Sequence, residues 1–398
     1  MNLRFNKFGH CLTFLIFVSS SNGEDVSKNK TSHNTQFIDP LIEEQSVKLW
    51  NATTEELDKL QEKNNDYCKP MYYYTPDFRA EGRRVSEVKC LEHIWRIRYD
   101  IEKRLREFVS CPDRDMVGPV VVGGDDAEVG EIPHMGAIGW LGTGYVMWVF
   151  KCGGVLISEK FVLTAAHCSR VTSRDTTVTN ITPQVVRFGT VNIFGVDKNG
   201  VPPQDVRISR FIVHDKYHAP KRYYDIALIE LIKNVEFTRN IHPACLWTKE
   251  NEISGKGIVA GWGVVDTASR RTSSKLQVAA VDMVPSEECN NTLKRRRNRN
   301  WSHGLASHQI CAGHMSGGID ACQGDSGGPL HIKLQMPIDI QFEWGMHYVV
   351  GVTSFGHGCA LANTPSVFSK VSHFIDWIEN IVWEKEVNVT LKENVKSK

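Results

Sequence analysis

Cysteine is the residue that most restricts how this chain can fold, because the sequence contains eleven of them. Near the N-terminus, Arg4 and Lys7 precede an apolar run over residues 11–18, and three serines follow at 19–21. This order predicts a secretory signal peptide over residues 1–23, and the run is too short to cross a bilayer. A buried first strand is the alternative interpretation. Removal of the leader leaves ten cysteines, an even number that favours disulfides in an oxidising compartment.

Composition and charge exclude several classes of protein. Hydrophobic residues make up 41% of the chain and charged residues 23%, which excludes a disordered or fibrous chain. Since 47 Lys and Arg balance 46 Asp and Glu, no general attraction to nucleic acid is expected. No later apolar stretch is long enough for a membrane anchor. Six glycosylation sequons agree with secretion: Asn29, Asn51, Asn180, Asn290, Asn300 and Asn388.

The chain changes character along its length. Residues 24–65 are polar, which predicts a flexible or weakly ordered segment. Apolar residues then recur at helical spacing and predict an amphipathic helix over 87–109. Beyond Gly123, short β-branched runs between Gly-rich turns predict a β-barrel or sandwich. These runs lie at 154–157, 185–188, 226–231, 257–260 and 349–352. A final helix is expected over 374–383.

Three short segments contain the residue types that nucleophilic catalysis by serine requires. They are Ala165-Ala166-His167-Cys168, Asp225-Ile226-Ala227-Leu228 and Gly324-Asp325-Ser326-Gly327-Gly328-Pro329. Serine is a weak nucleophile at neutral pH and needs an imidazole to accept its proton. The imidazole in turn needs a carboxylate to select its tautomer and to stabilise its charged form. A glycine-rich turn is the alternative interpretation of the third segment alone.

With these segments in this order, the chain resembles the trypsin/chymotrypsin family of serine proteases over residues 121–383. The resemblance implies an all-β fold of two six-stranded antiparallel β-barrels with a C-terminal helix, preceded by an N-terminal pro-segment. It implies that His167 is the general base, Asp225 its orienting carboxylate and Ser326 the nucleophile. The backbone N–H groups of Gly324 and Ser326 are then the oxyanion hole. No cofactor is expected.

The leader and the resemblance together predict the domain boundaries. They are a signal peptide over 1–23, from the order of residues at the N-terminus, a pro-region over 24–120, and a protease domain over 121–398, which begins with the resemblance.

The substrate pocket follows from the same resemblance. Asp320 lies six residues before Ser326, where trypsin-like members have the carboxylate at the base of the pocket. A buried carboxylate needs a partner, so cleavage after Arg or Lys is expected, with a surface-loop aspartate as the alternative. Ser354-Phe355-Gly356 resembles the strand that pairs with the substrate backbone. Ser366 occupies a wall position that is usually glycine in trypsin, which narrows the pocket and leaves the balance between Arg and Lys open.

The resemblance further implies a set of disulfides. It pairs Cys152 with Cys168, Cys289 with Cys311, Cys322 with Cys359, and Cys111 with Cys245. Cys68 and Cys90 remain, and a bond between them is the simplest inference, although other connectivities stay open. No metal is expected, because Thr190 stands where the trypsin calcium loop begins with an acidic residue.

The predicted activation site departs from trypsin. The run Val121-Val122-Gly123-Gly124 implies a cut between Val120 and Val121, after which the new N-terminal ammonium pairs with Asp325. Trypsin-like zymogens usually carry Arg or Lys before the cut. Val120 therefore implies an upstream activating protease that prefers small apolar residues.

These features, together with residues 82–90 and 132–140, resemble the secreted Snake/Persephone-like cascade proteases of arthropods. Protein substrates cut after Arg or Lys and serpin-type inhibitors are then the implied partners. Too few cysteines remain for an intact six-cysteine clip domain. The alternatives are a catalytically silent homologue that acts as a binding cofactor, and a digestive or venom protease.

One basic run, Lys294 to Arg299, has two interpretations. It is an exosite for acidic partners or polysaccharide, or a solvated loop or autolysis site, which is the interpretation that we favour from the sequence.

Overall fold

The structure is a computed structural model that describes residues 40–63, 73–110, 130–195, 202–266, 271–314, 326–334, 345–356 and 364–388. The predicted signal peptide over 1–23, the predicted cut between Val120 and Val121, and the sequon at Asn29 lie outside these ranges.

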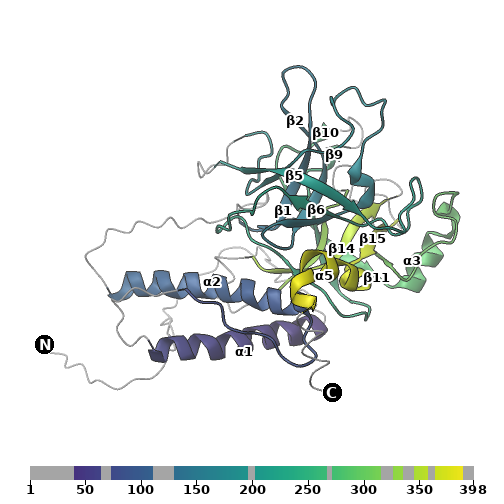
Figure 1. Ribbon diagram of the computed structural model, residues 1–398. Coiled ribbons are helices and arrows are strands. Elements are labelled where there is room, and N and C mark those ends of the chain that lie inside the picture. The colour runs from purple at the N-terminus through teal and green to yellow at the C-terminus, as the bar shows by residue number, and fades with distance from the viewer. Residues whose placement is uncertain are drawn as a thin grey trace, which may run out of the picture. The chain divides into compact units, whose positions relative to one another are not determined.

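A first set of six antiparallel strands closes into a barrel (Figure 1). The strands are β1 (Met135–Leu141), β2 (Trp148–Leu156), β3 (Phe161–Thr164), β4 (Val185–Phe188), β5 (Gln204–Val213) and β6 (Ala227–Leu231). Around the barrel they pair in the order β1-β2-β3-β6-β5-β4. Trp140 is fully buried in its core, and the ring Nε1 donates a hydrogen bond to the Ile181 carbonyl at 3.0 Å. This bond satisfies the polar edge of the ring, so the whole side chain can be buried.

A second set of six strands forms another barrel. The strands are β8 (Lys256–Gly261), β11 (Gln277–Val284), β12 (Gln309–Gly313), β13 (Pro329–Lys333), β14 (His347–Phe355) and β15 (Ser366–Lys370). They pair in the order β13-β8-β11-β12-β15-β14, and pairing of β13 with β14 closes the barrel. The short strand β7 (Cys245–Leu246) adds to β14 in parallel, while β9 (Val264–Asp266) and β10 (Arg271–Thr272) form a separate two-stranded sheet. The expected fold of two six-stranded antiparallel barrels is confirmed.

The runs predicted as strands overlap β2, β4, β6, β8 and β14. All nine residues of β14 are buried, because this strand contributes to two cores. Val349 lies in the core shared with the first barrel, whereas Tyr348 and Val350 lie in that of the second. A strand that is covered on both faces has a continuous apolar sequence, as β14 does.

Helices are short in the two barrels. They are η1 (Ala166–Ser169), α3 (Ser286–Thr292), η2 (Lys294–Arg296), η3 (Val371–Phe374) and α5 (Ile375–Val382). The helix predicted over 374–383 is present as α5, which buries Ile375 and Ile378 against the first barrel. Residues three apart share one helix face, so both can reach the same core. None of the helices that the structure describes is apolar enough over a sufficient length to cross a membrane.

The helix predicted over 87–109 is present as α2 (Val85–Ser110). Leu91, Ile94 and Trp95 are almost completely buried, and so is Cys90, which lies one turn before Ile94 on the same side of the helix. All four belong to a hydrophobic cluster that also contains residues of the second barrel. The broad apolar side of α2 is therefore covered by its neighbours.

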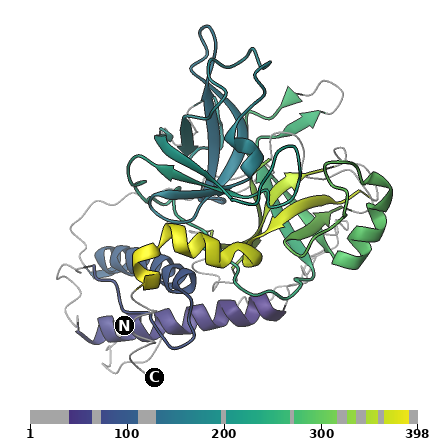
Figure 2. The same cartoon turned by 45° about the vertical axis from the view of Figure 1, so that its right-hand side comes forward.

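The expectation of a weakly ordered segment over 24–65 is wrong for its second half, which forms α1 (Pro40–Lys63). Figure 2 shows α1 beside α2, and the two helices are in contact. Arg98 of α2 donates to Thr53 Oγ1 of α1 at 2.7 Å, and its guanidinium lies 3.6 Å from the centre of the Trp50 ring. Three apolar side chains of α1 are buried in the same cluster as α2: Ile42, Leu49 and Leu60. Tertiary packing therefore stabilises a helix that composition does not indicate.

A disulfide joins α2 to the second barrel and corrects two predicted pairings. Cys90 is bonded to Cys245, with Cα atoms 5.0 Å apart. The predicted bonds Cys111–Cys245 and Cys68–Cys90 are therefore wrong, because each of them needs a sulfur that this bond uses. The physical reason is packing, since α2 contacts β7 and brings the two residues into one hydrophobic cluster.

The other disulfide predictions have different outcomes. The bonds Cys152–Cys168 and Cys289–Cys311 are both present. Cys322 and Cys359, together with Cys68 and Cys111, lie outside the described residues.

A buried carboxylate joins the start of α2 to α5. Glu379 is 6% exposed and accepts hydrogen bonds from Ser86 N at 3.0 Å and from Ser86 Oγ at 2.7 Å. Arg84 Nη2 also donates to Glu379, at 2.8 Å. Since burial of a carboxylate is unfavourable unless it is paired, this network attaches α2 to α5 specifically.

Three buried histidines lie where the two barrels meet. His134 precedes β1, whereas His331 and His347 belong to β13 and β14. The ring centres are 4.6 Å apart for His331 and His347, and that of His134 lies 5.1 Å from both. Burial lowers the pKa of His331 to about 3, and burial together with the neighbouring histidines lowers the pKa values of His134 and His347 well below the ordinary range. All three are therefore neutral at physiological pH.

This cluster predicts a loss of stability in acid. In the unfolded chain His331 takes up a proton near pH 6.5, whereas in the folded protein it does so only near pH 3. Its contribution to the free energy of unfolding is therefore complete above pH 6.5 and falls as the pH decreases. At pH 5 the loss is about 2 kcal/mol for this one residue. His331→Leu, which does not titrate, should reduce the change in the free energy of unfolding between pH 7.5 and 5 by that amount, as measured by urea denaturation. The exposed His303→Leu is the control, and an equal pH dependence in both variants would contradict the prediction.

Candidate active site

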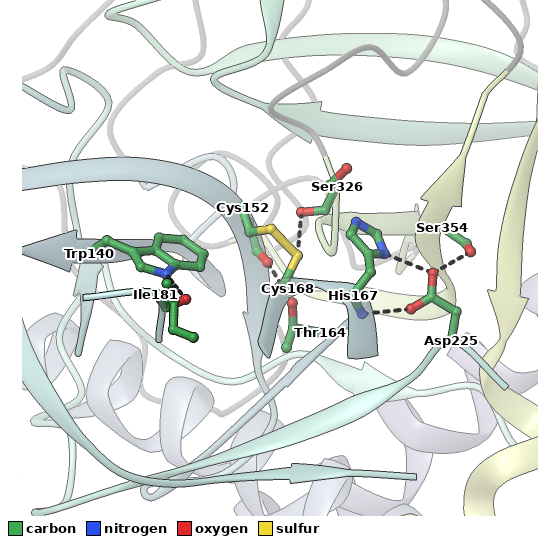
Figure 3. The surroundings of a disulfide bond; sticks show 10 residues. Trp140, Cys152, Thr164, His167, Cys168, Ile181, Asp225, Ser326 and Ser354 are labelled. Atoms are coloured by element: carbon green, nitrogen blue, oxygen red, sulfur yellow. Dashed lines mark hydrogen bonds and ion pairs between the residues drawn. A yellow bond between two sulfur atoms is a disulfide. The ribbon is translucent and has the colours of Figure 1, made fainter. Parts of the chain in front are cut away.

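Two predicted catalytic side chains come from neighbouring segments of the first barrel. His167 lies on η1, which follows β3, and Asp225 lies two residues before β6. Thr164 at the end of β3 is opposite Ala227 at the start of β6, so the two segments are adjacent. His167 Nδ1 lies 2.8 Å from Asp225 Oδ2, and the backbone N–H of His167 donates to Asp225 Oδ1 at 2.9 Å (Figure 3).

The carboxylate of Asp225 is buried and saturated with hydrogen bonds. Asp225 is 3% exposed, and besides the two bonds from His167 it accepts one from Ser354 Oγ at 2.5 Å. Its backbone carbonyl accepts a hydrogen bond from Ser369 Oγ at 2.7 Å. Ser354 belongs to β14 and Ser369 to β15, so the second barrel holds a carboxylate of the first. From the sequence, Ser354 is predicted only to bind substrate and Ser369 has no predicted role, because nothing in the local sequence signals these long-range contacts.

The two side chains shift each other's pKa. Burial would lower the pKa of His167, but the charge of Asp225 and its hydrogen bond outweigh burial, so the pKa of His167 is raised. Burial would raise the pKa of Asp225, but attraction to His167 and the hydrogen bonds from His167 and Ser354 lower it. Asp225 is thus ionised and can only accept, which places the imidazole proton on Nδ1 and leaves Nε2 able to accept a proton.

The third predicted side chain, Ser326, comes from the second barrel, shortly before β13. Its carbonyl accepts a hydrogen bond from Gly153 N at 2.8 Å, and the Gly153 carbonyl accepts one from Thr164 Oγ1 at 2.8 Å. Gly327 has a φ of 77°, and a Cβ there would lie 2.7 Å from the Gly153 oxygen. The backbones of the two barrels therefore meet at a point where only glycine fits. In Figure 3 the ring of His167 lies between Ser326 and Asp225.

The remaining predicted site residues are described in part. Ser366 is fully buried in β15 and pairs with Ala312 of β12. Gly356 is exposed directly after β14. Asp320, Gly324 and Asp325 lie outside the described residues, as do the activation residues Val120 and Val121.

Tyr224, beside Asp225, is a positioning residue that the sequence did not indicate. Its φ is 56°, which is unusual for a residue with a bulky side chain. Its ring stacks on His214 and on His308, with ring centres 5.4 and 4.1 Å apart, and its N–H donates to His308 Nε2 at 3.1 Å. These contacts hold the backbone in a strained conformation just before the carboxylate.

The site offers little to a metal ion. Among the described residues, one group has enough ligand atoms close together, namely Cys152, Cys168 and His167. The two sulfurs are bonded to each other, so no thiolate remains to bind a metal. Thr190, which stands where the calcium loop of trypsin begins with an acidic residue, is buried, and its hydroxyl donates to the Asn192 carbonyl at 2.8 Å.

The described sequons differ in exposure. Asn51, Asn180 and Asn388 are exposed, whereas Asn290 and Asn300 are half-buried. Glycosylation at these positions stays a prediction.

The chain is similar to known proteins over most of its length. The family profile described as Trypsin matches residues 121–378. The chain is 36% identical to serine protease snk of Drosophila melanogaster over 78% of this chain and 67% of that protein. It is 40% identical to serine protease Hayan of the same organism over 66% of this chain, but spans only 39% of that longer protein. It is also 34% identical to the clotting factor G beta subunit of Tachypleus tridentatus over 59% of this chain and 72% of that protein.

Proposed function

Because the chain belongs to the trypsin family and is therefore a serine endopeptidase, we propose that it is a secreted zymogen that cleaves after Arg or Lys in an extracellular cascade. The observation that carries the proposal is the pairing of the half-buried His167 with the buried Asp225, next to Ser326 at the junction of the two barrels. The similarity to a clotting factor subunit supports a cascade role. The predicted leader and the disulfides support secretion.

In the proposed mechanism, His167 Nε2 accepts the hydroxyl proton of Ser326 while the serine oxygen attacks the scissile carbonyl carbon. The oxyanion that forms is bound by the N–H groups of Gly324 and Ser326. The tetrahedral intermediate collapses, the C–N bond breaks, and the leaving amine takes the proton from His167. Water then attacks the acyl-enzyme with the same base and releases the acid product. Asp225 stabilises the imidazolium in both stages.

The proposed activation step is a cut between Val120 and Val121, which frees an ammonium group for Asp325. Val120 is a branched hydrocarbon, so the activator is a protease that prefers small apolar residues. The bond Cys90–Cys245 keeps α1 and α2 attached to the protease domain after this cut. The active enzyme is then a two-chain protein with a covalently bound helical segment.

Specificity is tested by replacing Asp320. Asp320→Ser removes the carboxylate that pairs with a substrate cation, which should lower kcat/KM on Arg peptides by about 10²- to 10³-fold, the equivalent of about 3–4 kcal/mol. Labelling of Ser326 by a serine-directed phosphonate should be retained. The exposed Asp215→Ser serves as the matched control, with unchanged kinetics. Equal cleavage of Arg peptides by Asp320→Ser would show that Asp320 is not at the base of the pocket.

A further inference from the structure

Two loops beside the active site carry a concentration of positive charge. One connects β5 to β6 and the other follows α3. Together they contain eight cationic residues, which we call the basic surface: Lys216, Lys221, Arg222, Lys294, Arg295, Arg296, Arg297 and Arg299. The loops are bonded to each other, since Lys221 Nζ donates to the Arg299 carbonyl at 2.6 Å and Arg222 N to the Asn300 carbonyl at 3.0 Å. They therefore form one continuous surface.

The charge of this surface is not neutralised by the protein. In the part of the chain that the structure describes, none of the eight side chains lies within ion-pair distance of a carboxylate. Arg297 is held by the neutral Asn290, whose Oδ1 accepts a hydrogen bond at 2.9 Å. The whole chain has a net charge of only +1. The same two loops contain the carboxylates of Asp215 and Asp225, so they have a net excess of about six positive charges, which creates a strong positive potential at this site in a nearly neutral protein.

Arg222 extends the basic surface to the catalytic pair. It precedes Asp225 by three residues, and its guanidinium carbon lies 4.4 Å from the centre of the Phe355 ring. Phe355 directly follows Ser354, whose hydroxyl donates to Asp225. The Nη1 atom of Arg222 is buried and has no hydrogen-bond partner in the described structure. The aromatic ring stabilises the cation in part, but a carboxylate would complete its interactions.

We propose that the basic surface is an exosite for an acidic stretch of the protein substrate near the scissile bond, with Arg222 contacting the acidic residue closest to that bond. The inference rests on the proposed function, because it takes Ser354-Phe355-Gly356 as the strand that pairs with the substrate backbone. A substrate on this strand passes Phe355 and so reaches Arg222. A sulfated polysaccharide is negatively charged like an acidic peptide, but nothing would direct it along the strand that leads to the catalytic pair. Residues 294–299 are joined to the loop that carries Arg222 by the hydrogen bond from Lys221 to the Arg299 carbonyl.

The test compares cleavage of matched peptides by the activated full-length enzyme. Each internally quenched peptide contains one Arg as its cleavage site. In one acidic series a run of Asp and Glu precedes this Arg, and in the other the run follows it. The neutral counterparts have Asn and Gln in place of Asp and Glu. At low salt, one of the acidic peptides should be cleaved with a kcat/KM at least about tenfold above that of its neutral counterpart, mainly through KM. Added NaCl should reduce this preference, because it screens charges on an exposed surface.

Variants locate the effect. Arg222→Gln should lower the acidic preference, which is the ratio of kcat/KM on an acidic peptide to kcat/KM on its neutral counterpart, by about fivefold to tenfold, and Arg222→Lys should retain part of it. A triple variant, Arg295→Gln with Arg296→Gln and Arg299→Gln, should remove most of the salt-dependent remainder. Lys233→Gln, an exposed cation elsewhere on the first barrel, is the matched control and should change nothing. Labelling of Ser326 by a serine-directed phosphonate shows that each variant is folded.

The outcomes separate the two hypotheses. If no peptide is cleaved after Arg or Lys, the proposed specificity fails. If neutral peptides are cleaved but neither acidic series is preferred, or if the preference survives Arg222→Gln and the triple variant, the exosite is overturned. It is likewise overturned if the triple variant loses only binding to heparin and keeps the full acidic preference.

Discussion

Ser326→Ala is expected to reduce peptide hydrolysis by about 10⁴- to 10⁶-fold, because no other group at the site can form the acyl-enzyme. His167 would still be oriented by Asp225, but it would have no hydroxyl to deprotonate. The measurement is kcat/KM on an Arg peptide after activation at Val121, together with labelling by a serine-directed phosphonate. Labelling should disappear with the activity.

The control for this experiment is a serine that lies outside the proposed machinery. Ser307 is exposed, so Ser307→Ala should keep full activity and labelling. Thermal unfolding of Ser326→Ala should match that of the unaltered protein, which shows that the loss is chemical. Near-full activity of Ser326→Ala would refute the assignment of the nucleophile.

Val120→Arg is expected to convert a zymogen that cannot activate itself into one that can. A pocket built around Asp320 requires a cation, and Val120 would leave that carboxylate unpaired, at a cost of about 3 kcal/mol or more. At about 1.4 kcal/mol per factor of ten, self-cleavage of the natural bond should be slower by at least about 100-fold. The purified zymogen is incubated with a trace of its active form, and the appearance of the Val121 N-terminus is followed by sequencing.

A shifted cleavage site is the matched control. Val117→Arg should be cut equally well but would leave Gly118, Pro119 and Val120 ahead of Val121, so the ammonium could not reach Asp325 and no activity should appear. In both variants the cut chains should separate only on reducing gels, because Cys90 and Cys245 stay bonded. Rapid self-cleavage of the natural zymogen would show that the pocket or the activation bond is wrongly assigned.

The local sequence determined much of this protein. The short β-branched runs at 185–188 and 257–260 became β4 and part of β8, because alternation and turn residues act within a few positions. The catalytic segments were also recognisable, because the motifs around His167 and Ser326 that resemble the family span only a few positions each. The helical spacing from Leu91 to Trp95 likewise predicted α2.

Only the tertiary structure decided how distant segments combine. Cys245 bonds to Cys90 because α2 packs on β7, and α1 is helical because its few apolar side chains are covered by the same cluster. The hydrogen bonds from the second barrel to Asp225, and the hydrogen bond from Lys221 to the Arg299 carbonyl, also connect residues far apart in the chain. Such contacts depend on the relative placement of whole elements, which no local pattern encodes, because the free energy that selects them comes from burial shared among many residues.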